Sequence, residues 1–212
     1  MTPLLALFDV DGTLFLTDDP LAGVALKDTL ADRYGVELPD DAIGRVDHQG
    51  QTSLRIARLV LAATGVDEPK ELGDWCRDFA ERYLELLADA DTRKWQAAPE
   101  AQAALEQLAT AEVRLALLTG NPEPIARARL ARLGLASFFP AGQGAFGCES
   151  ESREELIALA RHRAGDVPAS STVEVGDTPR DASSSRAAGI RSIIVGEEGL
   201  TVAAIRQLLS SA

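Results

Sequence analysis

The sequence predicts an α/β fold with an open parallel sheet that is interrupted by an all-helical insertion. Short apolar runs bounded by Gly, Pro or Asp alternate with helical patterns along most of the chain. This alternation is typical of a parallel sheet with crossover helices. One interval breaks it, because no convincing strand occurs from about residue 16 to residue 98. The sequence therefore predicts one sheet domain and one helical insert.

Four strands and four helices are expected in the sheet domain. The predicted strands are short apolar runs, typical of strands buried on both faces: Leu4–Phe8, Val113–Leu118, Thr172–Val175 and Ile193–Val195. The helical patterns between them begin at proline or end close to glycine, as helices commonly do: Pro99–Thr110, Ile125–Leu133, Glu154–Arg163 and Pro179–Ala188.

The insert is predicted to hold three helices between the first and second strands. They span residues 20–34, 52–64 and 71–90, and the first two stop at Gly35 and Gly65. Aromatic side chains at three-to-four spacing in the third helix favour a core within the insert over a ligand-binding face. The predicted boundaries are residues 1–15 and 99–212 for the sheet domain and 16–98 for the insert.

The composition limits the partners of the protein. Its 212 residues include 21 basic and 33 acidic side chains, a formal net charge of −12. We expect neither nucleic acid nor an anionic membrane surface as a partner, since both attract basic patches. No run approaches the ~20 apolar residues that span a bilayer, and the N-terminus lacks the basic region of a signal peptide, so we expect a cytoplasmic protein. Cys76 and Cys148 are expected to be two unpaired thiols in a reducing compartment.

Polar clusters follow the predicted strands at their carboxyl ends, where ligands bind in open α/β sheets. The first is Asp9-Val10-Asp11-Gly12-Thr13. Two carboxylates one residue apart can share a cation, or one can attack phosphorus while the other donates a proton to the leaving oxygen. A calcium-binding loop is disfavoured because Leu14 occupies the sixth position, where glycine is needed. A simple polar turn stays open as an alternative.

The next two clusters are candidates for phosphate binding. Thr119, Gly120 and Asn121 precede a predicted helix, so a hydroxyl, backbone amides and a helix N-terminus could cradle an anion. Asn121 could equally cap that helix. Arg153 lies in the first turn of another predicted helix, where the helix dipole mildly disfavours a cation. It either pairs with a bound anion or is an ordinary solvated side chain.

The fourth cluster adds two more carboxylates. Asp181 could complete a helix cap, whereas Asp177 directly follows a buried strand and is expected at the same sheet edge as Asp9. Asp9, Asp11 and Asp177 would repel one another unless a divalent cation joins them. Oxygen ligands beside a phosphate favour Mg²⁺ over a transition metal.

The order of these motifs resembles that of the haloacid dehalogenase-like hydrolase superfamily: Asp9-x-Asp11-Gly-Thr, Thr119-Gly-Asn121, a basic residue, then Gly-Asp177-x-x-x-Asp181. The resemblance implies a Rossmann-like core, with helices on both faces of the sheet, and an inserted helical cap. It implies that Asp9 is a nucleophile that is phosphorylated transiently, and that Asp11 protonates the leaving group and then activates water. Mg²⁺ would be held by Asp9, the backbone carbonyl of Asp11, and Asp177, with Asp181 in support.

The resemblance also implies the residues that bind the phosphoryl group, namely Thr119, Gly120, Asn121 and a basic residue. The superfamily usually has lysine in that last place, and Arg153 is the candidate here; its guanidinium can bind phosphate through two nitrogens. Residues 50–56 resemble the Gly-x-Thr-Asp-x-x-Ile cap segment of phosphoglycolate phosphatase-like members, although residue 53 is serine. The cap residues Gln51 and Thr52 are therefore candidate substrate contacts.

Together these residues predict a Mg²⁺-dependent phosphomonoesterase acting on a small phosphorylated metabolite, 2-phosphoglycolate or a similar compound. Two other functions stay open, a sugar phosphomutase of the same superfamily and a non-catalytic binder of a phosphorylated ligand. A haloacid dehalogenase is disfavoured because that branch lacks the second aspartate of the first motif, here Asp11.

Overall fold

The computed structural model describes residues 4–66 and 72–205. The sheet domain is built on five parallel strands in the order β3-β2-β1-β4-β5. They are β1 (Leu5–Phe8), β2 (Arg114–Thr119), β3 (Ala145–Phe146), β4 (Thr172–Gly176) and β5 (Arg191–Ile194). The predicted α/β class and parallel sheet are confirmed. The sequence did not predict β3, because two residues are too few to show a periodicity.

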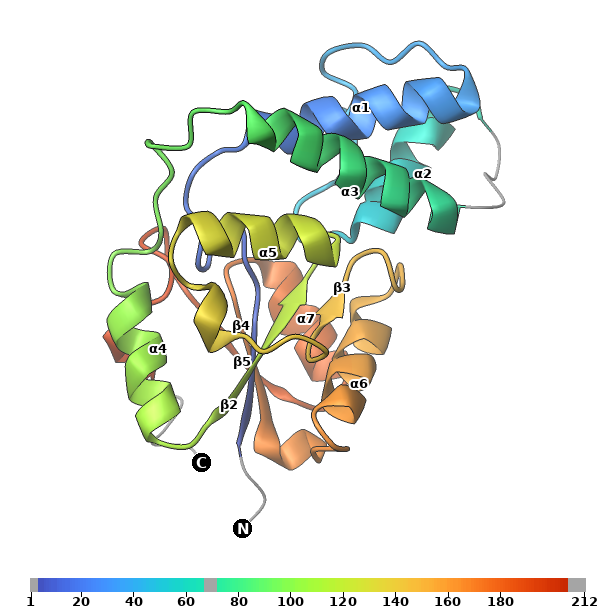
Figure 1. Ribbon diagram of the computed structural model, residues 1–212. Helices are drawn as coiled ribbons and strands as arrows, with labels where there is room; N and C mark the ends of the chain where they lie inside the picture. Colours follow the sequence, from blue (N-terminus) through green and yellow to red (C-terminus); the bar gives the residue numbers. More distant parts are fainter. Residues whose placement is uncertain (1–3, 67–71, 206–212) are drawn as a thin grey trace.

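Helices cover both faces of this sheet, as expected for a Rossmann-like core (Figure 1). One face packs against α4 (Ala101–Thr110) and α5 (Glu123–Arg132), and the other against α6 (Arg153–Arg163), which contacts α7 (Pro179–Ala187). Alternate strand residues point to opposite faces, so Phe8 packs in the hydrophobic cluster with α4 and α5, and Leu7 packs in the cluster with α6. None of the helices in the described ranges has the length and apolarity needed to cross a membrane.

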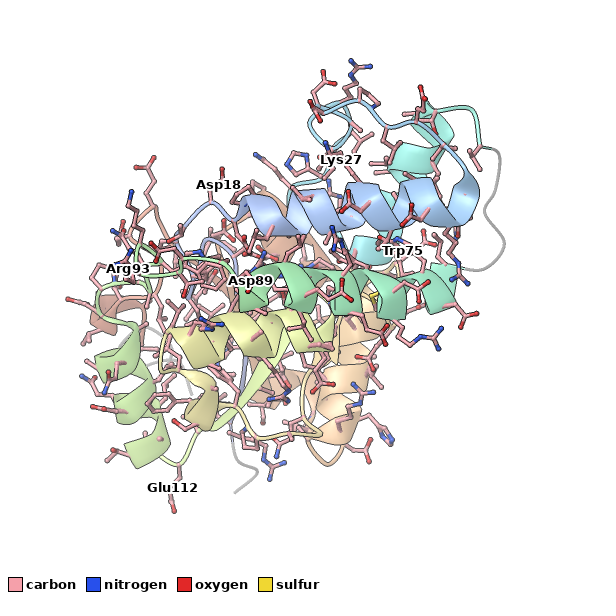
Figure 2. The ribbon with its side chains drawn as sticks, turned by 45° about the horizontal axis from the view of Figure 1, so that its top comes forward. Asp18, Lys27, Trp75, Asp89, Arg93 and Glu112 are labelled. Atoms are coloured by element: carbon pink, nitrogen blue, oxygen red, sulfur yellow. A yellow bond between two sulfur atoms is a disulfide. The ribbon has the colours of Figure 1, made fainter. Side chains whose placement is uncertain are left out.

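Of the helices between β1 and β2, three form a separate layer above the sheet domain (Figure 1). They are α1 (Pro20–Tyr34), α2 (Ser53–Ala63) and α3 (Leu72–Ala88). Their hydrophobic cluster includes Trp75, a residue of α3 on the side that faces α1 (Figure 2). The indole nitrogen of Trp75 donates to the hydroxyl of Thr29 at 2.9 Å, and its ring stacks on Phe79. The aromatic side chains of α3 thus pack inside the helical layer.

The chain enters and leaves the helical layer through two segments that lie side by side. The amide of Leu16 donates to the carbonyl of Gln96 at 2.9 Å, and the amide of Ala98 donates to the carbonyl of Leu14 at 3.0 Å. These paired segments connect the layer to the end of β1, directly beside the first acidic motif.

A disulfide joins Cys76 to Cys148, so the expectation of two unpaired thiols is wrong. The two cysteines are 72 residues apart in sequence, but their Cα atoms are separated by 5.8 Å, which is within the range a disulfide requires. Helix α3 packs beside the segment that follows β3, and two distant cysteines carry no sequence signal of such a contact. The bridge ties the helical layer to the sheet domain.

Candidate active site

A cleft of about 560 Å³ lies where the carboxyl ends of the strands face the helical layer. It brings together residues from three strand ends, from the start of α6 and from the loop before α2. Most of the residues singled out in the sequence line it: Asp9, Asp11, Gln51, Thr119, Gly120, Asn121, Arg153 and Asp177.

Asp9 and Asp11 lie in a tight turn that directly follows β1. Two successive backbone amides donate to the carbonyl of Val10 at 2.9 and 2.8 Å and close the turn. Gly12 has a φ of +71°, which side chains rarely adopt, and a Cβ there would collide with the carboxylate of Asp177. Glycine therefore allows the turn after β1 to approach the loop after β4.

Three carboxylates form a compact cluster at this cleft: Asp9 and Asp177 line it, and Asp181 is fully buried beside them. Asp9, Asp177 and Asp181 each offer one oxygen, and these oxygens all lie within 4.8 Å of one another. Burial raises the pKa of Asp9 well above its usual value, and burial together with the charge of Asp181 raises that of Asp177. The buried Oδ1 of Asp181 makes no hydrogen bond of good geometry, and its neighbour is the Nη2 of Arg153. An all-oxygen donor set with excess negative charge fits a divalent cation such as Mg²⁺.

Arg153 is buried at this cluster, with 4% of its side chain exposed, and is not a solvated surface residue. Its Nη2 lies 2.9 Å from Glu174, 2.5 Å from Asp181 and 3.8 Å from the Oδ2 of Asp9. Burial works to lower the pKa of Arg153, but these three carboxylates raise it above its usual value. The sequence reasoning missed Glu174, although a glutamate within an otherwise buried strand was a signal.

The loop after β2 presents a hydroxyl and an amide side chain to the cleft. The buried Oγ1 of Thr119 accepts hydrogen bonds from the backbone and the side chain of Asn121, at 3.3 and 3.1 Å. The side chain of Asn121 also donates to Asp11. Pro122, not Asn121, occupies the N-cap of α5, so the capping alternative for Asn121 does not hold.

The segment before α2 docks directly on this loop. Ser53 donates to the carbonyl of Gly120 from its backbone amide at 2.8 Å and from its hydroxyl at 2.9 Å. Gln51 lines the cleft. Thr52 is fully buried and is the N-cap of α2, accepting from the amide of Arg55 at 3.2 Å. Thr52 therefore holds the start of a helix in place and does not line the cleft.

Arg129 is a second buried cation at the cleft that the sequence reasoning missed. It comes from α5, and its Nη1 lies 2.8 Å from the Oδ1 of Asp11. A signal was present, because Arg129 falls on the buried face of α5 together with Ile125, Ala126 and Leu130.

A family model described as "Haloacid dehalogenase-like hydrolase" matches residues 6–195. The chain belongs to this family. Two phosphoglycolate phosphatases are 30% identical to it. The match to the enzyme from Rhodospirillum rubrum covers 91% of this chain and 79% of that protein. The match to the enzyme from Caulobacter vibrioides covers 89% of this chain and 77% of that protein. The tyrosine-protein kinase PtkA of Mycobacterium tuberculosis is 28% identical over 92% of this chain and 62% of that protein.

The fold is also similar to that of a solved structure. The crystal structure of CbbY from Rhodobacter sphaeroides in complex with phosphate superposes with a TM-score of 0.62 at 21% identity, covering 92% of this chain and 86% of that chain. With the family and the phosphatase relatives established, the chain is a hydrolase of the phosphatase type.

Proposed function

We propose that this protein is a Mg²⁺-dependent phosphomonoesterase that hydrolyses a small phosphorylated metabolite through an aspartyl-phosphate at Asp9. The observation that carries the proposal is the cluster of Asp9, Asp177 and Asp181, whose oxygens lie within 4.8 Å of one another, beside Arg153. Mg²⁺, held by these carboxylates and the backbone carbonyl of Asp11, would offset the negative charge of the cluster and of the phosphoryl oxygens.

The two oxygens of Asp9 have different surroundings. Oδ1 accepts a hydrogen bond from the amide of Val10 at 2.8 Å, which leaves Oδ2, the oxygen facing Arg153 at 3.8 Å, to attack phosphorus. As the bond to phosphorus forms, the bond from phosphorus to the ester oxygen breaks, and Asp11 gives that oxygen a proton. Asp11 then takes a proton from the water that attacks the aspartyl-phosphate. Inorganic phosphate leaves and Asp9 is restored.

The surrounding residues orient the phosphoryl group and the rest of the substrate. In this proposal Thr119, Gly120, Asn121 and Arg153 hold the phosphoryl oxygens, where preorganised donors stabilise the developing charge. Residues 16–98 act as a cap that closes over the substrate and excludes bulk water, with Gln51 as a substrate contact. 2-Phosphoglycolate is the first candidate substrate, because two bacterial relatives are named phosphoglycolate phosphatase.

The test is phosphate release from p-nitrophenyl phosphate, followed by a screen of metabolite phosphates that includes 2-phosphoglycolate. We expect turnover with Mg²⁺, loss of turnover with a chelator, and loss in Asp9→Asn. Asp18→Asn is the matched control, because Asp18 lines the same cleft outside the carboxylate cluster. Turnover that persists in Asp9→Asn would refute the nucleophile assignment.

A second assay distinguishes the phosphomutase alternative. Incubation with a hexose 1-phosphate should release inorganic phosphate or leave the sugar unchanged. Conversion to the hexose 6-phosphate without phosphate release would show transfer to a sugar and replace the phosphomonoesterase proposal.

A further inference from the structure

Arg129 joins the acid–base carboxylate to the interior of the protein. Its side chain is only 3% exposed, whereas that of Asp11 is 51% exposed. The Nη1 of Arg129 lies 2.8 and 3.1 Å from the two oxygens of Asp11 and 3.2 Å from the side-chain oxygen of Asn121. A fixed guanidinium thus contacts both oxygens of a carboxylate that is open to the cleft.

The other nitrogens of Arg129 are held by residues that belong to the helical layer. Nη2 and Nε donate to the Oδ2 of Asp19 at 2.8 and 3.1 Å, and the hydroxyl of Tyr83, on α3, donates to the same oxygen at 2.7 Å. The guanidinium carbon lies 5.2 and 5.4 Å from the ring centroids of Phe15 and Tyr83. Aromatic faces at this separation attract and orient a cation.

Asp19 has a further partner that makes it part of the helical layer. Its Oδ1 accepts from the amide of Leu21 at 3.0 Å and caps the N-terminus of α1. The side chain of Asp19 is 2% exposed. The orientation of Arg129 therefore depends on where α1 begins and where α3 lies.

We propose that Arg129 is a positioning residue for Asp11, and that the helical layer sets this position through Asp19 and Tyr83. The proposal rests on the acid–base role of Asp11 in the proposed function. A structural ion pair would be complete with Asp19 alone, because that pair is buried on both sides. The additional contacts of Nη1 are made to the half-exposed carboxylate of Asp11, which water alone could solvate. Their effect is therefore to fix where the oxygens of Asp11 lie. Catalytic groups act well only when neighbouring contacts lock their geometry.

The leaving group of the substrate separates positioning from a general loss of structure. Nitrophenolate leaves readily without a proton, whereas an alkoxide needs the acid, and a placed general acid contributes about 10²–10⁴-fold. We therefore expect Arg129→Met to lower kcat for glycerol 2-phosphate at least ~10-fold more than kcat for p-nitrophenyl phosphate. Arg129→Lys, which can still donate to Asp11, should recover part of that difference.

Arg127→Met is the matched control, since Arg127 lies on the same helix and contacts Glu123 and the carbonyl of Phe139 instead of Asp11. It should affect both substrates equally. Tyr83→Phe, which keeps the ring and removes one hydroxyl, should show a smaller alkyl-selective loss even if Arg129→Met does not fold. Equal losses on both substrates in Arg129→Met, or wild-type behaviour of Tyr83→Phe, would overturn the proposal. Neither result bears on the assignment of Asp9 as the nucleophile, which the Asp9→Asn variant tests separately.

Discussion

The disulfide between Cys76 and Cys148 links the helical layer to the sheet domain, and breaking it tests how strongly the two are held together. The bridge closes a loop across 72 residues. In the chain-entropy model, a loop of that length restricts the unfolded chain enough to stabilise the fold by about 4 kcal/mol. For a protein of this size that corresponds to a fall in Tm of roughly 8–16 °C on reduction.

The assay is thermal unfolding of the wild type and of the Cys76→Ala/Cys148→Ala double variant, each with and without a thiol reductant. The Tm of the wild type should fall on reduction. The double variant should have the Tm of the reduced wild type, and the reductant should not change it. Mass spectrometry under non-reducing conditions should find the two cysteines in one cross-linked peptide pair. Two free thiols in the oxidised preparation, or a wild-type Tm that the reductant leaves unchanged, would refute the reasoning.

Three further substitutions test the packing of the site and of the helical layer. Arg153→Met should lower the free energy of unfolding by about 3–5 kcal/mol in chemical denaturation, because it leaves buried carboxylates without their cation. Arg153→Lys, which keeps a cation, should lower it less, and an equal loss in both variants would contradict the need for a buried charge. Gly120→Ala places a Cβ against the backbone before α2 and should lower kcat/KM about 10²-fold, while Gly73→Ala, where a Cβ meets no atom within 4 Å, should not. Thr29→Val leaves the buried indole N–H of Trp75 without its acceptor and should cost about 1–3 kcal/mol in the unfolding free energy, so an unchanged value would exclude that bond as a stabilising contact.

The approach of Asp9 to Asp177 was predictable from the sequence because both directly follow buried strands. Parallel strands end at the same edge of a sheet, so residues placed immediately after them converge whatever the exact strand order. The strand order and the two-residue strand β3 were not predictable in this way. They depend on packing between distant segments, which local periodicity does not report.

The two buried arginines show where local pattern stops being informative. The sequence placed Arg153 in the first turn of a helix and made it a candidate phosphate contact, but it did not predict its burial. That burial follows from Glu174 on β4, which faces Arg153 at 2.9 Å. Arg129 lies among apolar residues on the buried face of α5, and the sequence pattern alone does not show what pairs with its charge. Both are explained by partners more than twenty residues away, and such pairing becomes visible only when the tertiary structure is known.

An arginine at position 153 has a geometric consequence that a lysine there would not have. A lysine presents one compact charge, whereas the planar guanidinium spreads its donors over several directions. Here Nη2 faces Glu174 and Asp181, and Nη1 faces the carbonyl of Gly50 at 3.5 Å. One side chain thus contacts β4, α7 and the segment before α2, while its buried Nε keeps a donor without a partner. An ammonium at the same place could neutralise the carboxylates but could not reach all three elements, so arginine here serves the placement of the segment before α2 as well as the charge of the cleft.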